Sequence, residues 1–230
     1  MKIDILTLFP SFFDILNDYG VIGRSLAEGR LDLRVHQIRD YAHDRHQQVD
    51  DTVFGGAAGM LMKPDVLAEA IEDVSGDDGH VIFLSPQGSV LTQDKARQLT
   101  EYDHLVLLCG HYEGVDARIT RHFVDEEISI GDYVLTGGEL PAMVLLDTLV
   151  RWVDGVLGNP ESAKTDSHAE GLLQYDEYTK PRDFRGYTVP EVLLNGNHGA
   201  IAEWRLNNAI EKTKERRPDL YARWREEHQE

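Results

Sequence analysis

The chain has 230 residues, a length that supports one large hydrophobic core or one core with a small appended domain. Hydrophobic residues make up 41% and charged residues 28% of the sequence, which excludes a disordered, collagen-like or coiled-coil protein. The formal net charge is −18, and a single cysteine, Cys109, excludes an intramolecular disulfide and any zinc site built from cysteines.

The first residues, MKIDILTLFP, carry two charges and lack the apolar stretch of a secretory signal. No later segment approaches the roughly 20 apolar residues of a membrane-spanning helix, so we expect a cytoplasmic protein with no membrane partner. Residues 1–179 hold 13 basic and 32 acidic side chains, whereas residues 180–230 hold 10 and 9. The carboxyl-terminal part is therefore better suited to a nucleic-acid partner, although charge alone does not decide this.

Apolar β-like runs alternate with helical patterns over the first 150 residues, which predicts an α/β fold with a mainly parallel sheet. Strands are expected at residues 3–8, 31–38, 81–84, 105–109 and 127–130. Helices are expected near residues 12–17, 64–72, 93–101 and 115–121, and a longer one from 139 to about 153. Pro64 suits a first helical turn, and Thr92 suits an N-cap.

A change in composition follows residue 156. The stretch GNPESAKTDSHAEG at 158–171 is rich in small and polar residues and predicts a linker or a functional loop. The remainder has one short apolar run at 189–194 and then helical patterns at 198–217 and 218–227. This predicts a small helical domain after the α/β domain.

Three expected strands run into short turns that contain glycine: LSPQGS at 84–89, CGHYEGVD at 109–116 and SIGDYVLTGGE at 129–139. Ligands of open α/β sheets bind beyond the carboxyl ends of the strands, so the three turns predict one shared pocket. For any single turn, a glycine that merely reverses the chain is the alternative. The sequence lacks both a dinucleotide fingerprint and a phosphate loop, so we expect the pocket to suit a neutral adenine ring. The apolar side chains available for it are Phe83, Leu84, Tyr133 and Leu135.

Other candidate sites are weaker. His43 and His46 lie three residues apart, but no third metal ligand is well placed, so solvated loop histidines are the better interpretation. Cys109 ends an apolar run and is interpreted as a buried small residue, not a nucleophile. The segment VFGGAAGMLM at 53–62 is either a loop over a substrate or a simple turn.

The glycine turns and the segments around them resemble those of the bacterial tRNA (guanine-N1)-methyltransferases, a family in the knotted SPOUT class. The matching segments include KIDILTLFP and TDSHAEGLLQYDEYTKP, and highly specific ones are GHYEGVD, SIGDYVLTGGE and VLLNGNH. The match spans nearly the whole chain. It implies a knotted α/β domain over residues 1–158, with a deep trefoil knot toward its carboxyl-terminal end. A linker that carries the catalytic Asp would follow at 159–172, and a helical tRNA-binding domain at 173–230.

The resemblance implies a methyl transfer from S-adenosylmethionine to N1 of the guanosine immediately 3′ to the anticodon, position 37. By matching motifs, the donor-binding residues are Leu84, Ser85, Pro86, Gly110, Tyr112, Glu113, Gly114, Ser129, Ile130, Gly131, Tyr133, Leu135, Gly137, Gly138 and Pro141. The resemblance also allows a dependence of turnover on Mg²⁺, and the sequence predicts no metal site on the protein.

The same motifs imply two catalytic residues. Asp166 corresponds to the general base that removes the N1 proton, and Arg151 to the arginine that stabilises negative charge on the guanine O6. An exposed Asp has a pKa of about 3.9 and is a weak base, so Asp166 would need burial or the charge of Arg151. Without the resemblance, Asp166 would be interpreted as a helix N-cap.

The implied partners are tRNA and a second copy of the chain, in a homodimer whose subunits share the active site. The substrate-binding candidates are His46, Asp50, Gly55, Gly59, Lys180, Arg182 and Arg205. The sequence departs from the family pattern at Val53, Ala57, Asp154 and His168, which puts the packing of two loops in question. A catalytically idle RNA-binding protein is the alternative, and a nicotinamide-dependent oxidoreductase is disfavoured by the missing fingerprint.

Overall fold

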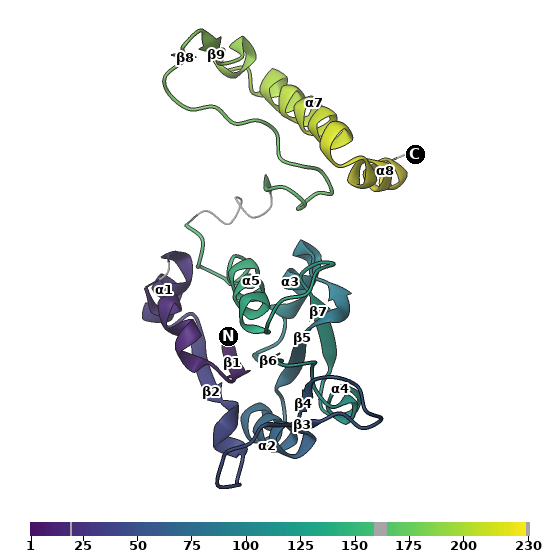
Figure 1. Ribbon diagram of the computed structural model, residues 1–230. Coiled ribbons are helices and arrows are strands. Elements are labelled where there is room, and N and C mark those ends of the chain that lie inside the picture. Colours follow the sequence, from purple (N-terminus) through teal and green to yellow (C-terminus); the bar gives the residue numbers. More distant parts are fainter. Residues whose placement is uncertain (19, 159–164, 229–230) are drawn as a thin grey trace. The chain divides into compact units, whose positions relative to one another are not determined.

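The computed structural model describes residues 1–18, 20–158 and 165–228. The chain divides into two compact units, Met1–Gly158 and Asn159–Glu230, which are described separately (Figure 1). Within the described residues, no helix is both long enough and apolar enough to cross a membrane.

In the described part of the first unit, five strands form one sheet in which all neighbouring pairs are parallel. The strand order is β2-β1-β6-β5-β7. The strands are β1 (Lys2–Thr7), β2 (Asp32–Gln37), β5 (His80–Val90), β6 (His104–Cys109) and β7 (Glu126–Ser129). The prediction of an α/β fold with a mainly parallel sheet is therefore confirmed.

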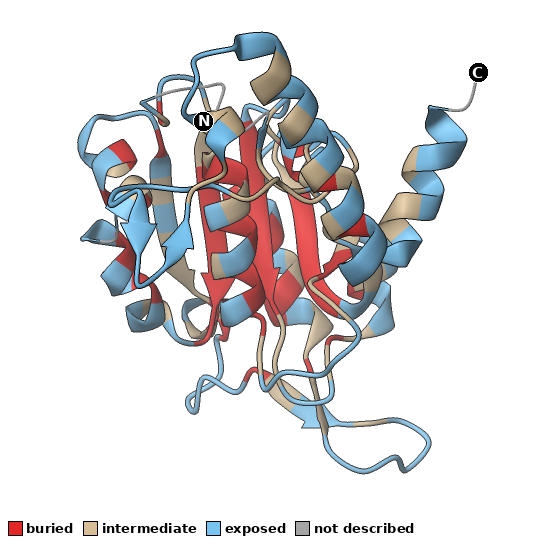
Figure 2. Cartoon of the chain, turned by 90° about the horizontal axis from the view of Figure 1, so that it is seen from above, coloured by how far each residue is buried: buried red, intermediate tan, exposed pale blue. Residues whose placement is uncertain are grey.

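Helices cover both faces of this sheet (Figure 1). One face packs against α1 (Gly20–Ala27), α3 (Gln93–Leu99) and α5 (Glu139–Val150). The other packs against α2 (Pro64–Ser75) and α4 (Ala117–His122). Every residue of β6 is buried, and Figure 2 shows the central strands of the sheet in red, the colour of buried residues. Burial on both faces explains why β6 and the first half of β5 appear in the sequence as nearly continuous apolar runs.

Several expected elements differ from the observed ones. Residues 12–17 belong to a 3₁₀-helix, η1 (Pro10–Asn17), not an α-helix, and a second, η2 (Ile38–Tyr41), follows β2. Helix α1 was not predicted, because its two glycines lower its intrinsic helix propensity. The hairpin of β3 (Asp50–Thr52) and β4 (Met60–Met62) was not predicted either, since its strands are only three residues long.

The second unit contains the hairpin of β8 (Asp183–Phe184) and β9 (Tyr187–Thr188), then η3 (Glu191–Leu193), α7 (His198–Arg216) and α8 (Pro218–Glu227). The buried Thr213 of α7 accepts a hydrogen bond from the backbone N–H of Leu173 over 2.9 Å. Lys212 donates to the carbonyl oxygen of Gln174 over 2.9 Å. These bonds hold the segment around residues 173–174 against α7.

A buried charge network lies in the sheet, among residues that do not line the pocket described below. The Asp4 side chain is 1% exposed, and its carboxylate contacts His36 at 2.5 Å, His104 at 2.7 Å and Lys2 at 2.9 Å. Burial raises the pKa of Asp4, but hydrogen bonds from these three side chains outweigh burial and hold the pKa below its ordinary value of 3.8. The network therefore stabilises the ionised form of Asp4.

Asp4→Asn is expected to lower the free energy of unfolding at pH 7 by about 3 kcal/mol, because the buried donors lose their anionic partner. A lowered carboxyl pKa stabilises the fold above the unfolded pKa, and this contribution is lost as pH falls through the folded value. The difference from wild type should therefore shrink below about pH 4. Urea unfolding over this pH range measures the effect. Asp32→Asn is the control, since the exposed pair Asp32–Arg34 contributes less than about 1 kcal/mol to stability. An equal loss of unfolding free energy in the two variants would contradict the prediction.

Candidate functional site

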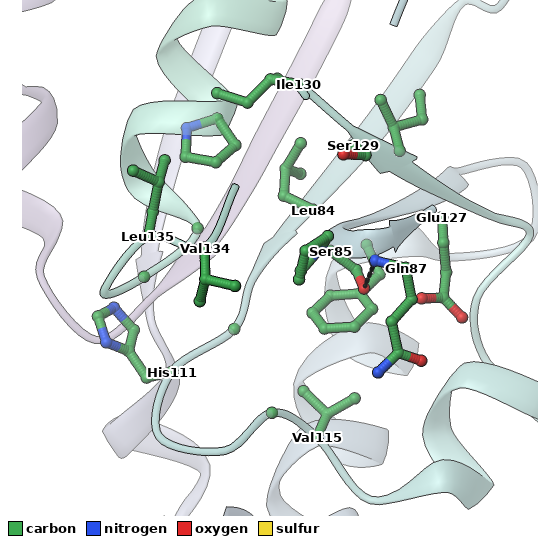
Figure 3. A pocket seen from close by; sticks show the side chains of 18 of the residues that line it. Leu84, Ser85, Gln87, His111, Val115, Glu127, Ser129, Ile130, Val134 and Leu135 are labelled. Atoms are coloured by element: carbon green, nitrogen blue, oxygen red, sulfur yellow. Dashed lines mark hydrogen bonds between the residues drawn. The ribbon is translucent and has the colours of Figure 1, made fainter. Parts of the chain in front are cut away.

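A pocket of about 370 Å³ lies at the carboxyl ends of β5, β6 and β7. Its walls come from the three glycine-containing turns, and its volume is in the range of small-molecule sites (Figure 3). All fifteen residues expected to bind the donor line this one pocket. The turns therefore share a cavity, as the sequence predicts, while the contact of these residues with a donor stays a prediction.

The first wall is a bulge in β5. Ile128 of β7 is opposite both Leu84 and Ser89, so the residues between them leave the ladder. The hydroxyl oxygen of Ser85 accepts a hydrogen bond from the backbone N–H of Gln87 over 3.1 Å (Figure 3). The bulge thereby places Ser85, Pro86 and Gln87 in the pocket lining.

The second wall is the turn after β6, residues 109–116, and the third wall is the turn after β7, residues 129–139. A backbone hydrogen bond joins these two walls. The N–H of Gly138 donates to the carbonyl oxygen of Gly110 over 3.0 Å. A Cβ at Gly138 would lie 2.6 Å from Cα of Cys109, and a Cβ at Gly110 would lie 2.7 Å from the ring of Phe83. Glycine is required at both positions by this close approach, not by unusual backbone angles.

The β3–β4 hairpin is attached to the second wall. Glu113 donates its N–H to the carbonyl of Met60 over 3.0 Å, and Met62 donates to the carbonyl of Gly114 over 3.0 Å. Asp50 lies on β3, while Gly55 and Gly59 lie in the loop of the hairpin, with φ values of +87° and +89°. Three of the predicted substrate-binding residues are thus carried by a hairpin that hydrogen-bonds to the pocket wall.

His43 and His46 are exposed, whereas Cys109 is buried. His43 pairs with Glu69 at 2.8 Å. In the ranges that the structure describes, no group of three His, Cys, Asp or Glu side chains is placed to hold a metal ion. Burial raises the pKa of Cys109 well above its ordinary value, and the charge of Glu139 adds to this, so the thiol is a poor nucleophile.

The two predicted catalytic residues belong to different units. Arg151 is the C-cap residue of α5 in the first unit, and it is half-buried. Asp166 belongs to the second unit, where its carbonyl oxygen accepts a hydrogen bond from the N–H of Ala169 over 3.2 Å. Asp166 lies in a bend after the helical Thr165, so no helix begins there and the N-cap interpretation is wrong. The catalytic roles of Asp166 and Arg151 stay predictions.

The cationic candidates of the second unit are Lys180, Arg182 and Arg205, and one of them contacts an aromatic ring. The guanidinium of Arg205 is 4.8 Å from the ring centroid of Tyr175. Lys180 and Arg182 are exposed just before the β8–β9 hairpin. The hairpin also exposes Arg185, whose guanidinium lies 5.2 Å from the ring centroid of Phe184.

Sequence reasoning missed some pocket residues. His111, Gln87 and Val134 line the pocket but were not among the predicted residues (Figure 3). All three lie inside the quoted turns, so their position next to predicted residues was the available signal. His111 also forms hydrogen bonds with Glu139, which no short-range pattern indicates.

Comparisons with known proteins show which family the chain resembles over its length. A family model described as tRNA (Guanine-1)-methyltransferase TrmD matches residues 1–223. The chain is 53% identical over 227 residues to a tRNA (guanine-N(1)-)-methyltransferase of Finegoldia magna, with 99% of this chain and 97% of the relative covered. Proteins of the same name from Magnetococcus marinus and Moorella thermoacetica are 54% and 51% identical. Those matches cover 96% and 97% of this chain, and 89% and 91% of the relatives.

Proposed function

The chain belongs to the tRNA (guanine-1)-methyltransferase family, and from this we propose that it methylates N1 of the guanosine immediately 3′ to the anticodon, position 37, in tRNA. The observation that carries the proposal is the single pocket that gathers all fifteen donor-binding candidates. A catalytically idle RNA-binding protein has no support among the relatives, which are named as methyltransferases.

The methyl donor in this proposal is S-adenosylmethionine, and the pocket residues suit it. Leu84, Ile130 and Leu135 supply apolar surface for a purine ring, and the glycine turns supply backbone hydrogen-bonding groups. Glu113 lines the same pocket, and its negative charge would favour a cation there. When bound, the donor would supply a methyl group from a positively charged sulfur. The leaving group would be the rest of the donor, in which this sulfur is a neutral thioether.

We assign the proton transfer to Asp166. The donor would supply the methyl group that guanine N1 takes up, and the Asp166 carboxylate would accept the proton that N1 loses. Arg151 stabilises the negative charge that develops on O6 as the proton leaves. The bound tRNA must present the guanosine out of its stack for these groups to reach the base.

The proposed methyl transfer to tRNA also assigns a role to each part of the chain. Residues 1–158 form the donor domain, 159–172 the linker with the catalytic Asp, and 173–230 the tRNA-binding domain. The charges support this division, since residues 1–172 hold 13 basic and 30 acidic side chains, whereas residues 173–230 hold 10 and 11. Phosphate contacts are therefore expected from Lys180, Arg182 and Arg205.

A trefoil knot and a homodimer are further parts of the proposal. After β7, the chain passes against the end of β6, where Gly138 is hydrogen-bonded to Gly110, and this crossing is consistent with a knot. Apolar side chains on the segment after β7 are strongly exposed: Val134 is 82% and Leu140 51% accessible. Such exposure is typical of a surface that a partner covers, so a second copy of the chain would bury it.

The test is a methyl-transfer assay with radiolabelled S-adenosylmethionine. Two tRNA transcripts are compared, with guanosine or adenosine immediately 3′ to the anticodon. We expect incorporation only into the guanosine transcript, with the label at N1 by nucleoside analysis. Equal incorporation into both transcripts, or none despite measurable donor binding, would overturn the proposed function.

A further inference from the structure

A buried carboxylate lies directly behind the pocket. Glu139 is 5% exposed and is the first residue of α5. Its Oε1 atom accepts a hydrogen bond from the hydroxyl of Thr7 over 2.6 Å. Nε2 of His111 lies 2.8 Å from both carboxylate oxygens. One carboxylate therefore connects the end of β1, the turn after β6 and the start of α5.

The three residues relate differently to the pocket. His111 lines it, whereas Thr7 and Glu139 do not. Thr7 is fully buried, and its hydroxyl also accepts a hydrogen bond from the N–H of Phe9 over 3.0 Å. The ring of Phe9 packs edge-on against His111, with centroids 5.0 Å apart. His111 is thus held from two sides by residues that a pocket ligand does not touch.

The location of Glu139 makes these bonds strong. Hydrogen bonds to a charged group are stronger than neutral ones, and burial strengthens them further. The positive end of the α5 dipole also favours a carboxylate in the first turn. Gly137 and Gly138 of the pocket wall directly precede Glu139, so the same anchor fixes the second and third walls relative to each other.

We propose that Thr7 and Glu139 are positioning residues for the donor pocket, because they hold His111 and the second and third pocket walls in the geometry that binds the donor. This inference rests on the proposed donor binding. Holding the walls before binding removes the cost of ordering them in the complex. Neither residue is a catalytic residue in this scheme, since neither lines the pocket.

The central test uses Thr7→Val and Thr7→Ser in the full chain. Valine keeps the shape but removes the hydroxyl, whereas serine keeps the hydroxyl. We expect Thr7→Val to weaken S-adenosylmethionine binding by about tenfold, as for loss of a hydrogen bond to a buried charge, and Thr7→Ser to restore most of it. Isothermal calorimetry measures the affinity, and the KM for tRNA should stay unchanged while the KM for the donor rises.

Glu139→Gln and Glu139→Ala extend the series. Glutamine retains hydrogen-bonding atoms and should weaken donor binding less than alanine, which removes all contacts. If Thr7→Val does not fold, Glu139→Gln carries the test, since it preserves side-chain shape. Asp4→Asn is the matched control, because Asp4 is equally buried with two histidine partners and does not line the pocket.

The outcomes separate three cases. Positioning would be supported if Thr7→Val, the Glu139 variants and Asp4→Asn all had a lower melting temperature, but only Thr7→Val and the Glu139 variants bound the donor more weakly. The inference would be overturned if Asp4→Asn weakened donor binding equally, or if Thr7→Val and Glu139→Gln left donor binding unaffected. Either result would leave the proposed function intact. Absence of donor binding by the wild-type protein would instead overturn the proposed function.

Discussion

Asp166→Ala is expected to lower kcat for methyl transfer to tRNA by a factor of about 10² to 10⁴, the usual contribution of a general base. The N1–H of guanine must be lost as the methyl group arrives, and without the carboxylate only water is left to accept this proton. Asp166 is not among the residues that line the donor pocket, so the affinity for S-adenosylmethionine should stay within about twofold of wild type. Single-turnover kinetics with saturating tRNA and donor measure the chemical step.

Glu177→Ala is the control for this experiment. Glu177 is an exposed carboxylate of the same structural unit, and the mechanism assigns it no role. It should retain the wild-type single-turnover rate. A wild-type rate in Asp166→Ala would show that another group accepts the proton, and an equal loss in both variants would point to a general effect of charge on tRNA binding.

The central strands of the sheet were predictable because they are buried, although the edge strand β2 has no buried residue. Strand β6 is a continuous apolar run, and each expected strand overlaps an observed one. The hairpin of β3 and β4 was not predictable, because its strands are short and its pairing partners are separated by a loop of small residues. Intrinsic helix propensity also failed to predict α1, because the packing of Ile22 into the core outweighs the unfavourable effect of two glycines on the helix.

The part of the site that short sequence motifs form was predictable. The three glycine turns pointed to one pocket because parallel strands end at the same edge of a sheet. The contact between Thr7 and Glu139 joins residues 132 positions apart, and only the strand order brings them together. The bulge in β5 was hidden for a related reason, since the departure of residues 85–88 from the ladder depends on how β7 pairs with β5.

Gly138→Ala is expected to weaken donor binding by at least about 100-fold and to lower stability by about 1–3 kcal/mol, the usual cost of overpacking. Its φ of −82° is open to any residue, so backbone strain is not the reason. The added Cβ would lie 2.6 Å from Cα of Cys109 and 2.9 Å from N of Gly110, both backbone atoms at the end of a fully buried strand. Because these atoms are fixed by the sheet, the third wall must move away from the second and break the hydrogen bond from Gly138 to Gly110.

Gly199→Ala is the matched control for Gly138→Ala. Gly199 lies in the first turn of α7, and its added Cβ would come no closer than 3.6 Å to another atom, a normal contact. Alanine should stabilise that helix by up to about 1 kcal/mol and leave donor affinity unchanged. Calorimetry with S-adenosylmethionine and thermal unfolding of both variants make the comparison. Wild-type donor affinity in Gly138→Ala would mean that the pocket tolerates separation of its walls, and the close approach of the two turns would then have no role in binding.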